Sequence, residues 1–145
     1  MLQKLKTPFR WWLGVVFLSA GIGHFVSADF FLEIMPEWIP FHEACVYLSG
    51  IAEISLGTAL QIPKFRRQAA WGIIALLVVV FPVNINMALT GQTQLQHAPD
   101  FLPPISEAGL WVRLPIQFIL MAWAWWYTRE ETAAESPAEP PASGA

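Results

Sequence analysis

The sequence predicts an all-α integral membrane protein, folded as a four-helix antiparallel bundle. Of its 145 residues, 55% are hydrophobic and only 13% are charged, whereas about 25% of the residues are charged in an ordinary soluble domain. The rare charges leave four apolar runs, and each has about the ~20 residues that cross ~30 Å of hydrocarbon. A soluble chain this short could not bury so much apolar surface. Because lipid offers no partner for backbone polar groups, the four runs are expected to be helices.

We expect these helices at about 10–26, 43–61, 68–89 and 108–128, within one transmembrane domain over residues 1–129. After the first helix, residues 29–40 mix apolar and acidic side chains and contain two prolines. This pattern predicts a short amphipathic helix in the membrane interface. Residues 130–145 are rich in Glu, Ala, Pro, Ser and Gly. They have no apolar face to bury, so we expect a disordered cytoplasmic tail there.

Basic residues predict the orientation of the bundle. Three precede the first helix, three occupy the link at 62–68, and one follows the fourth helix: Lys4, Lys6, Arg10, Lys64, Arg66, Arg67 and Arg129. The other two links contain neither Lys nor Arg. The positive-inside rule therefore places the N and C termini in the cytoplasm. A cleavable signal peptide is the alternative for the first run, since a Lys-rich start and Val26-Ser27-Ala28 also fit that pattern.

Charge and cysteine content exclude several functions. The formal net charge of −3 gives no basic footprint for phosphates, so we expect no nucleic-acid partner. The single cysteine, Cys45, excludes an intrachain disulfide and a self-contained dithiol relay. His24, His42 and His97 lack the tight spacing of a ligand set such as H-x-x-x-H. We therefore expect no metal site.

Six polar side chains within the apolar runs are the candidate ligand-binding residues, because polar and ionisable groups are costly in hydrocarbon. They are His24, Glu53, Asn84, Asn86, Arg113 and Gln117. Helix rise places them in the outer half of the bundle, with Glu53 near the bilayer middle. We expect Glu53 to pair with Arg113, because each lowers the cost of burying the other. The alternatives are structural: a charged pair that holds the bundle together, and amides that hydrogen-bond between helices.

Small residues and prolines mark the same zone. Ser49, Glu53 and Gly57 share one helix face at i, i+4 and i+8, which permits a close approach of a second helix. Pro82 removes a backbone hydrogen bond just before Asn84 and predicts a kink in the third helix.

The order of the motifs resembles that of the DoxX-like family of small bacterial membrane proteins. The resemblance spans roughly residues 10–128. It rests on Gly21-Ile22-Gly23-His24-Phe25, Met35-Pro36-Glu37-Trp38-Ile39-Pro40, Ser49-Gly50-Ile51-Ala52-Glu53-Ile54-Ser55-Leu56-Gly57, Arg67-Gln68-Ala69-Ala70-Trp71-Gly72, Phe81-Pro82-Val83-Asn84-Ile85-Asn86-Met87-Ala88 and Trp111-Val112-Arg113-Leu114-Pro115-Ile116-Gln117. It implies a multi-pass protein of the bacterial inner membrane. DoxX-like proteins are linked to quinone-coupled sulfur oxidation, methylamine utilisation and thiol-redox assemblies, and others resemble assembly helpers.

The first functional hypothesis is therefore a binding subunit of a membrane redox system. The six candidate residues would line a pocket for a small lipophilic molecule such as a quinone, the possible cofactor. Glu53 or His24 would pass protons when the quinone is reduced. The redox centre would belong to a partner protein, and a homo-oligomer remains open. The alternatives are a non-catalytic assembly or scaffold protein and, with less support, a transporter.

Overall fold

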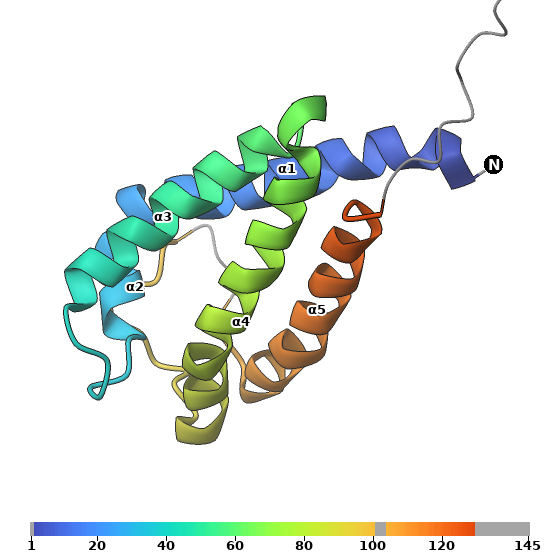
Figure 1. Ribbon diagram of the computed structural model, residues 1–145. Helices are drawn as coiled ribbons and strands as arrows, with labels where there is room; N and C mark the ends of the chain where they lie inside the picture. The colour runs from blue at the N-terminus through green and yellow to red at the C-terminus, as the bar shows by residue number, and fades with distance from the viewer. Residues whose placement is uncertain (1, 101–103, 130–145) are drawn as a thin grey trace, which may run out of the picture.

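The computed structural model describes residues 2–100 and 104–129 and is all-α, as predicted. Its elements in chain order are α1 (Leu2–Val26), α2 (Ala28–Glu33), α3 (His42–Ala59), the short 3₁₀ helix η1 (Pro63–Phe65), α4 (Arg66–Thr90) and α5 (Glu107–Trp126) (Figure 1). Helix α1 begins eight residues earlier than expected, and Pro8 lies inside it. The tail expected at 130–145 lies outside the described residues.

Three helices of the described residues are long and apolar enough to cross a membrane: Leu5–Val26, Pro63–Thr90 and Glu107–Trp126. The chain therefore has the character of a multi-pass membrane protein. The sequence predicted a fourth span in the second apolar run, which forms α3. This helix is absent from that set because His42, Glu43 and Glu53 lower its mean hydropathy.

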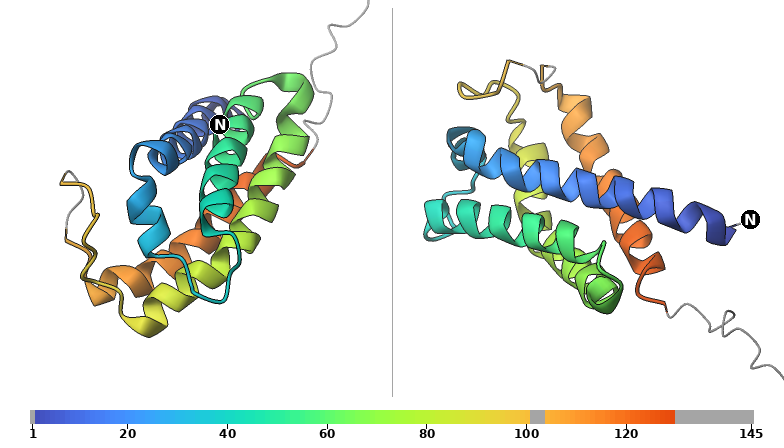
Figure 2. Two further views of the ribbon diagram at one scale, coloured as in Figure 1. Left: turned by 90° about the vertical axis from the view of Figure 1, so that its left-hand side faces the viewer. Right: turned by 90° about the horizontal axis from the view of Figure 1, so that it is seen from above.

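The long helices form two antiparallel pairs. Helix α1 packs along α3, and α4 packs along α5, whereas the contact between the pairs is mainly that of α3 with α4. The two pairs cross each other at an angle, as Figures 1 and 2 show from three directions. The short helix α2 turns the chain back from α1 toward α3 and packs against both. This arrangement brings the last turns of α1 against the first half of α3.

Two apolar clusters hold the pairs together at opposite ends of the molecule. The larger contains Leu13 and Phe17 from α1, Ile73 and neighbouring residues from α4, and Tyr127 just after α5. The hydroxyl of Tyr127 donates a 3.0 Å hydrogen bond to the carbonyl oxygen of Lys6, which ties the end of α5 to α1. The smaller joins α2 to the end of α4 and the start of α5 through Phe30, Ile34, Met87, Ala88 and Leu110.

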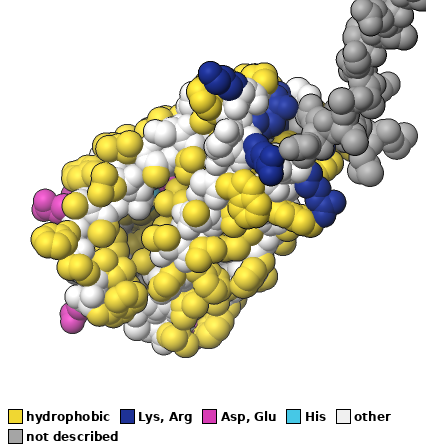
Figure 3. All heavy atoms as spheres, in the orientation of Figure 1, with side chains coloured by type: hydrophobic (Ala, Val, Ile, Leu, Met, Phe, Trp, Pro, Cys, Tyr) yellow, Lys and Arg dark blue, Asp and Glu magenta, His cyan; other side chains and the backbone are white. Residues whose placement is uncertain are grey.

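The surface between the helix ends is strongly apolar. Val79 on α4 is 72% exposed, and Ile119 on α5 is 63% exposed. Figure 3 shows Lys and Arg side chains gathered at one end of this face and Asp and Glu side chains at the other. We call these the basic end and the acidic end. An apolar band between two charged ends is the surface that a lipid bilayer requires.

Candidate functional site

Four glycines bring α1 and α3 into close contact. Gly14 and Gly21 on α1 face Gly57 and Gly50 on α3, and in each helix the two are seven residues apart. A Cβ atom added to Gly21 would lie 2.7 Å from the carbonyl oxygen of Gly50 and 2.9 Å from the backbone nitrogen of Ile54. Such distances leave no room for a side chain. The predicted close approach along the Gly57 face of α3 is therefore present, and α1 is the helix that makes it.

His24 and Glu53 meet beside this glycine contact. Each lies three residues after a glycine of the pair, His24 after Gly21 and Glu53 after Gly50. The His24 Nε2 atom lies 3.4 Å from the Glu53 Oε2 atom, and the two side chains are only 12% and 14% exposed. The His24 Nδ1 and Glu53 Oε2 atoms are buried without a hydrogen-bond partner among the described residues. Buried polar groups are normally satisfied, so these two atoms stand out among the described residues.

Phe31 of α2 completes the cluster. Its ring stacks on the His24 imidazole, with ring centroids 3.8 Å apart and an angle of 19° between the planes. Phe30, the preceding residue, is buried and packs edge-on against Phe31. The imidazole therefore contacts both the Phe31 ring and the Glu53 carboxylate. We call His24, Phe31 and Glu53 the dyad site, after its two titratable members.

The expected ion pair between Glu53 and Arg113 does not form. Glu53 faces α1 instead, because α3 pairs with α1 whereas α5 pairs with α4. The Arg113 Nη1 atom donates to the sulfur atom of Met87 at 3.7 Å. Within the described part of the chain no carboxylate forms an ion pair with Arg113.

The amide side chains pair with each other across α4 and α5. The Asn84 Nδ2 atom donates a 2.9 Å hydrogen bond to Gln117 Oε1. The Gln117 Nε2 atom donates to the carbonyl oxygen of Leu77, in the turn of α4 that precedes Pro82. Gln117 is 3% exposed. Asn86 accepts a bond from Thr90 through its backbone oxygen. The six predicted residues thus divide into separate groups, and no hydrogen bond or ion pair joins these groups within the described residues.

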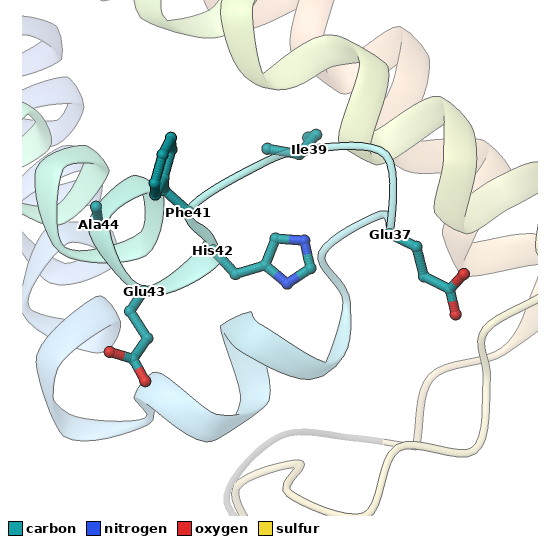
Figure 4. A pocket seen from close by; sticks show the side chains of 6 residues that line it. All are labelled: Glu37, Ile39, Phe41, His42, Glu43 and Ala44. Carbon is teal, nitrogen blue, oxygen red and sulfur yellow. The ribbon is translucent and has the colours of Figure 1, made fainter.

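Two open hollows lie at the acidic end, and none of the six predicted residues lines either one. The larger, about 500 Å³, lies in the loop between α2 and α3 and is lined by Glu37, Ile39, Phe41, His42, Glu43 and Ala44. Figure 4 shows His42 between the side chains of Glu37 and Glu43. The His42 Nε2 atom lies 3.0 Å from the carbonyl oxygen of Pro36, which closes the loop.

The second hollow adjoins a carboxylate clamp. The backbone amides of Gln96 and His97 donate to the two oxygens of Glu33 at 2.8 and 3.0 Å. These hydrogen bonds hold the pKa of the Glu33 carboxyl below its ordinary value of 4.5, and the bond from Gln96 has the largest effect. The clamp fixes the loop before α5 to the end of α2. Among the described residues no group of three or more His, Cys, Asp and Glu side chains is placed to hold a metal ion.

Two residues of these sites, Phe31 and Glu33, were not among the six residues predicted from the sequence. Phe31 lies in the segment expected to be amphipathic. The mixture of apolar and acidic residues in that segment was the only sequence feature that pointed to it. Glu33 lies more than 60 residues before the amides that it binds, so no local pattern could indicate the contact.

Comparison with known proteins shows the family of this chain. A family model described as "Domain of unknown function (DUF8561)" matches residues 13–128, so the chain belongs to this family. The match includes α3, α4 and α5 in full, α1 from residue 13 onward, and every residue of the dyad site. No curated protein and no solved structure matches the sequence.

Proposed function

We propose that the chain is a four-helix protein of the bacterial inner membrane that binds a small lipophilic ligand such as a quinone at the dyad site. In this proposal α3 is the fourth membrane helix. Its support is the glycine contact, which holds α3 antiparallel along α1, one of the three apolar spans. A helix packed along a membrane span at this distance shares its depth in the bilayer.

The orientation proposed is that of the positive-inside rule, with the N and C termini in the cytoplasm. Basic residues lie at the start of α1, around the start of α4 and just after α5, all at one end of the molecule. The dyad site is then in the outer half of the bundle, because His24 is two residues from the end of α1. Glu53, on α3, lies opposite it.

The unsatisfied atoms of His24 and Glu53 carry the proposal. A quinone offers two carbonyl acceptors and a quinol two hydroxyl donors, and an imidazole beside a carboxylate can serve both. The flat ring of such a ligand also suits the neighbourhood of Phe31. Reduction of a quinone takes up two protons and two electrons. Glu53 and His24 would transfer the protons, and a partner protein would supply the electrons.

Binding of a quinone by matched variants tests this function. Glu53→Gln keeps the shape of the side chain but removes its charge, and Glu43→Gln makes the same change at an exposed position of the same helix. We expect the wild type and E43Q to retain ubiquinone or menaquinone through purification, and E53Q to bind it about tenfold more weakly, a difference of about 1.4 kcal/mol. His24→Gln should weaken binding similarly. Equal retention by E53Q and E43Q would contradict the proposal.

A scaffold function is the second candidate, and the amide contact between α4 and α5 favours it. Asn84 donates a hydrogen bond to Gln117, and Gln117 donates one to the backbone of α4. Amides that only join helices make such bonds. In this case the dyad would also be structural, and its variants would lower stability without any effect on quinone retention. Unfolding of E53Q and E43Q in sodium dodecyl sulfate, measured beside their quinone retention, separates the two functions.

A further inference from the structure

Arg113 is the one basic residue of the chain that lies away from the basic end. The sequence has eight Lys and Arg residues, and the other seven lie at the start of α1, around the start of α4 and just after α5. Arg113 lies inside the apolar span Glu107–Trp126. It is six residues after Glu107, which is about 9 Å along the helix axis. Its guanidinium group is thus below the acidic end but within reach of the lipid head groups.

Among the described residues no carboxylate supplies a counter-charge to Arg113. The residue is exposed, and its hydrogen bond goes to the Met87 thioether sulfur, a neutral and weak acceptor. Within the described ranges Arg113 forms no ion pair with a carboxylate. A guanidinium has five donors and retains its charge in proteins. Since an uncompensated charge is costly in a membrane, an anion from outside the chain would lower that cost.

We propose that Arg113 binds the phosphate group of an anionic phospholipid in the leaflet at the acidic end. The planar fork of a guanidinium matches phosphate oxygens in pairs, and such bonds are among the strongest hydrogen bonds in proteins. Ile116, one turn further along α5 and 45% exposed, offers an apolar surface for the acyl chain. The exposed charges of the neighbouring links are carboxylates, which repel a lipid anion. Arg113 therefore marks one defined position for the head group. This site is separate from the dyad site and does not depend on the proposed function.

Native mass spectrometry of the full chain, released from detergent micelles, measures this binding. Phosphatidylglycerol is the anionic probe, and phosphatidylcholine is the probe without net charge. The variants are Arg113→Gln, Arg113→Lys and, as a matched loss of one exposed charge beyond the other end of α5, Arg129→Gln. We expect R113Q to bind phosphatidylglycerol about tenfold more weakly than the wild type. R113K should lie between them, and R129Q should remain within about twofold of the wild type.

Several results would overturn the proposal. One is equal phosphatidylglycerol binding by R113Q and the wild type, and another is an equal loss in R129Q. A third is that R113Q dissociates a dimer without any change in lipid binding, because the anion would then be a carboxylate of a second copy. Quinone retention by R113Q should equal that of the wild type, which distinguishes failure of this site from failure of the dyad site. Circular dichroism of R113Q confirms that the variant is folded.

Discussion

Replacing Gly21 by alanine should push α1 and α3 apart. The added Cβ atom would lie 2.7 Å from the Gly50 carbonyl oxygen and 2.9 Å from the Ile54 backbone nitrogen. Ordinary contacts of a carbon atom are about 3.5–4.0 Å. The third obstructing atom is the Ile54 Cγ1 atom at 2.7 Å, but the other two belong to the backbone, so rotation of the Ile54 side chain does not relieve the overlap. The helices must therefore separate by roughly 1 Å where the dyad site is formed.

The loss of stability follows from two opposing terms. Overpacking of a close contact costs about 1–3 kcal/mol. Alanine in a helix interior recovers about 0.5–1 kcal/mol relative to glycine. We therefore expect Gly21→Ala to lower the free energy of unfolding by about 1–2 kcal/mol. Gly23→Ala is the matched control on the same helix, because its Cβ would meet only the Phe31 ring, at an ordinary 3.7 Å. It should be neutral or more stable than the wild type by up to about 1 kcal/mol.

Titration of the protein from mild detergent into sodium dodecyl sulfate, followed by circular dichroism, measures these changes. The wild type, G21A and G23A should unfold in the order G21A first and G23A last. If G21A unfolds within about 0.5 kcal/mol of the wild type, or if G23A loses as much as G21A, the reasoning about the glycine contact is refuted.

Three further changes test other contacts. Asn84→Leu or Gln117→Leu leaves a buried amide unsatisfied and should lower the free energy of unfolding by about 1–3 kcal/mol in the same titration. The double variant should lose less than the sum of the two single losses, and additive losses would contradict the hydrogen bond. Ser106→Ala removes the hydroxyl that accepts a hydrogen bond from the Gly109 backbone amide in the first turn of α5 and should cost about 1 kcal/mol, whereas Ser106→Asp should cost little. Because its hydrogen bonds lower the pKa of Glu33, the clamp stabilises the loop at pH 4.5 and above and is lost as the pH falls through the lowered value. The protection factors of the Gln96 and His97 amides should therefore fall only below pH 4.5, and Glu33→Gln should lower them at neutral pH. Amides without protection in the wild type at neutral pH would exclude the clamp.

The helices could be predicted from the sequence because their signal is local. Apolar runs and the charges between them indicate where each helix begins and ends, and the helices lie close to the expected ranges. The early start of α1 was missed because its first residues are too polar for a membrane span. The number of membrane spans is harder to predict than the number of helices, because the acidic residues of α3 lower its mean hydropathy.

The pairing of the helices could not be predicted in the same way. The spacing of Ser49, Glu53 and Gly57 defines a face of α3, but it does not say which helix covers that face. The expected partner of Glu53 was Arg113, because opposite charges attract and both lie within apolar runs. The structure pairs Glu53 with His24 because the glycines of α1 complement those of α3. Complementary shape along two helices outweighed a single charge attraction at this position.

Photoaffinity labelling with an azido-quinone tests the central claim most directly, because it locates the bound ring within the chain. The protein in lipid nanodiscs would be illuminated with the probe and digested, and the modified peptides would be sequenced by mass spectrometry. The dyad site predicts labels within 21–31 and 46–57, removed by excess unlabelled quinone and strongly reduced in E53Q but not in E43Q. Labels confined to α4 and α5, or labels that excess quinone does not displace, would contradict a quinone site between His24 and Glu53.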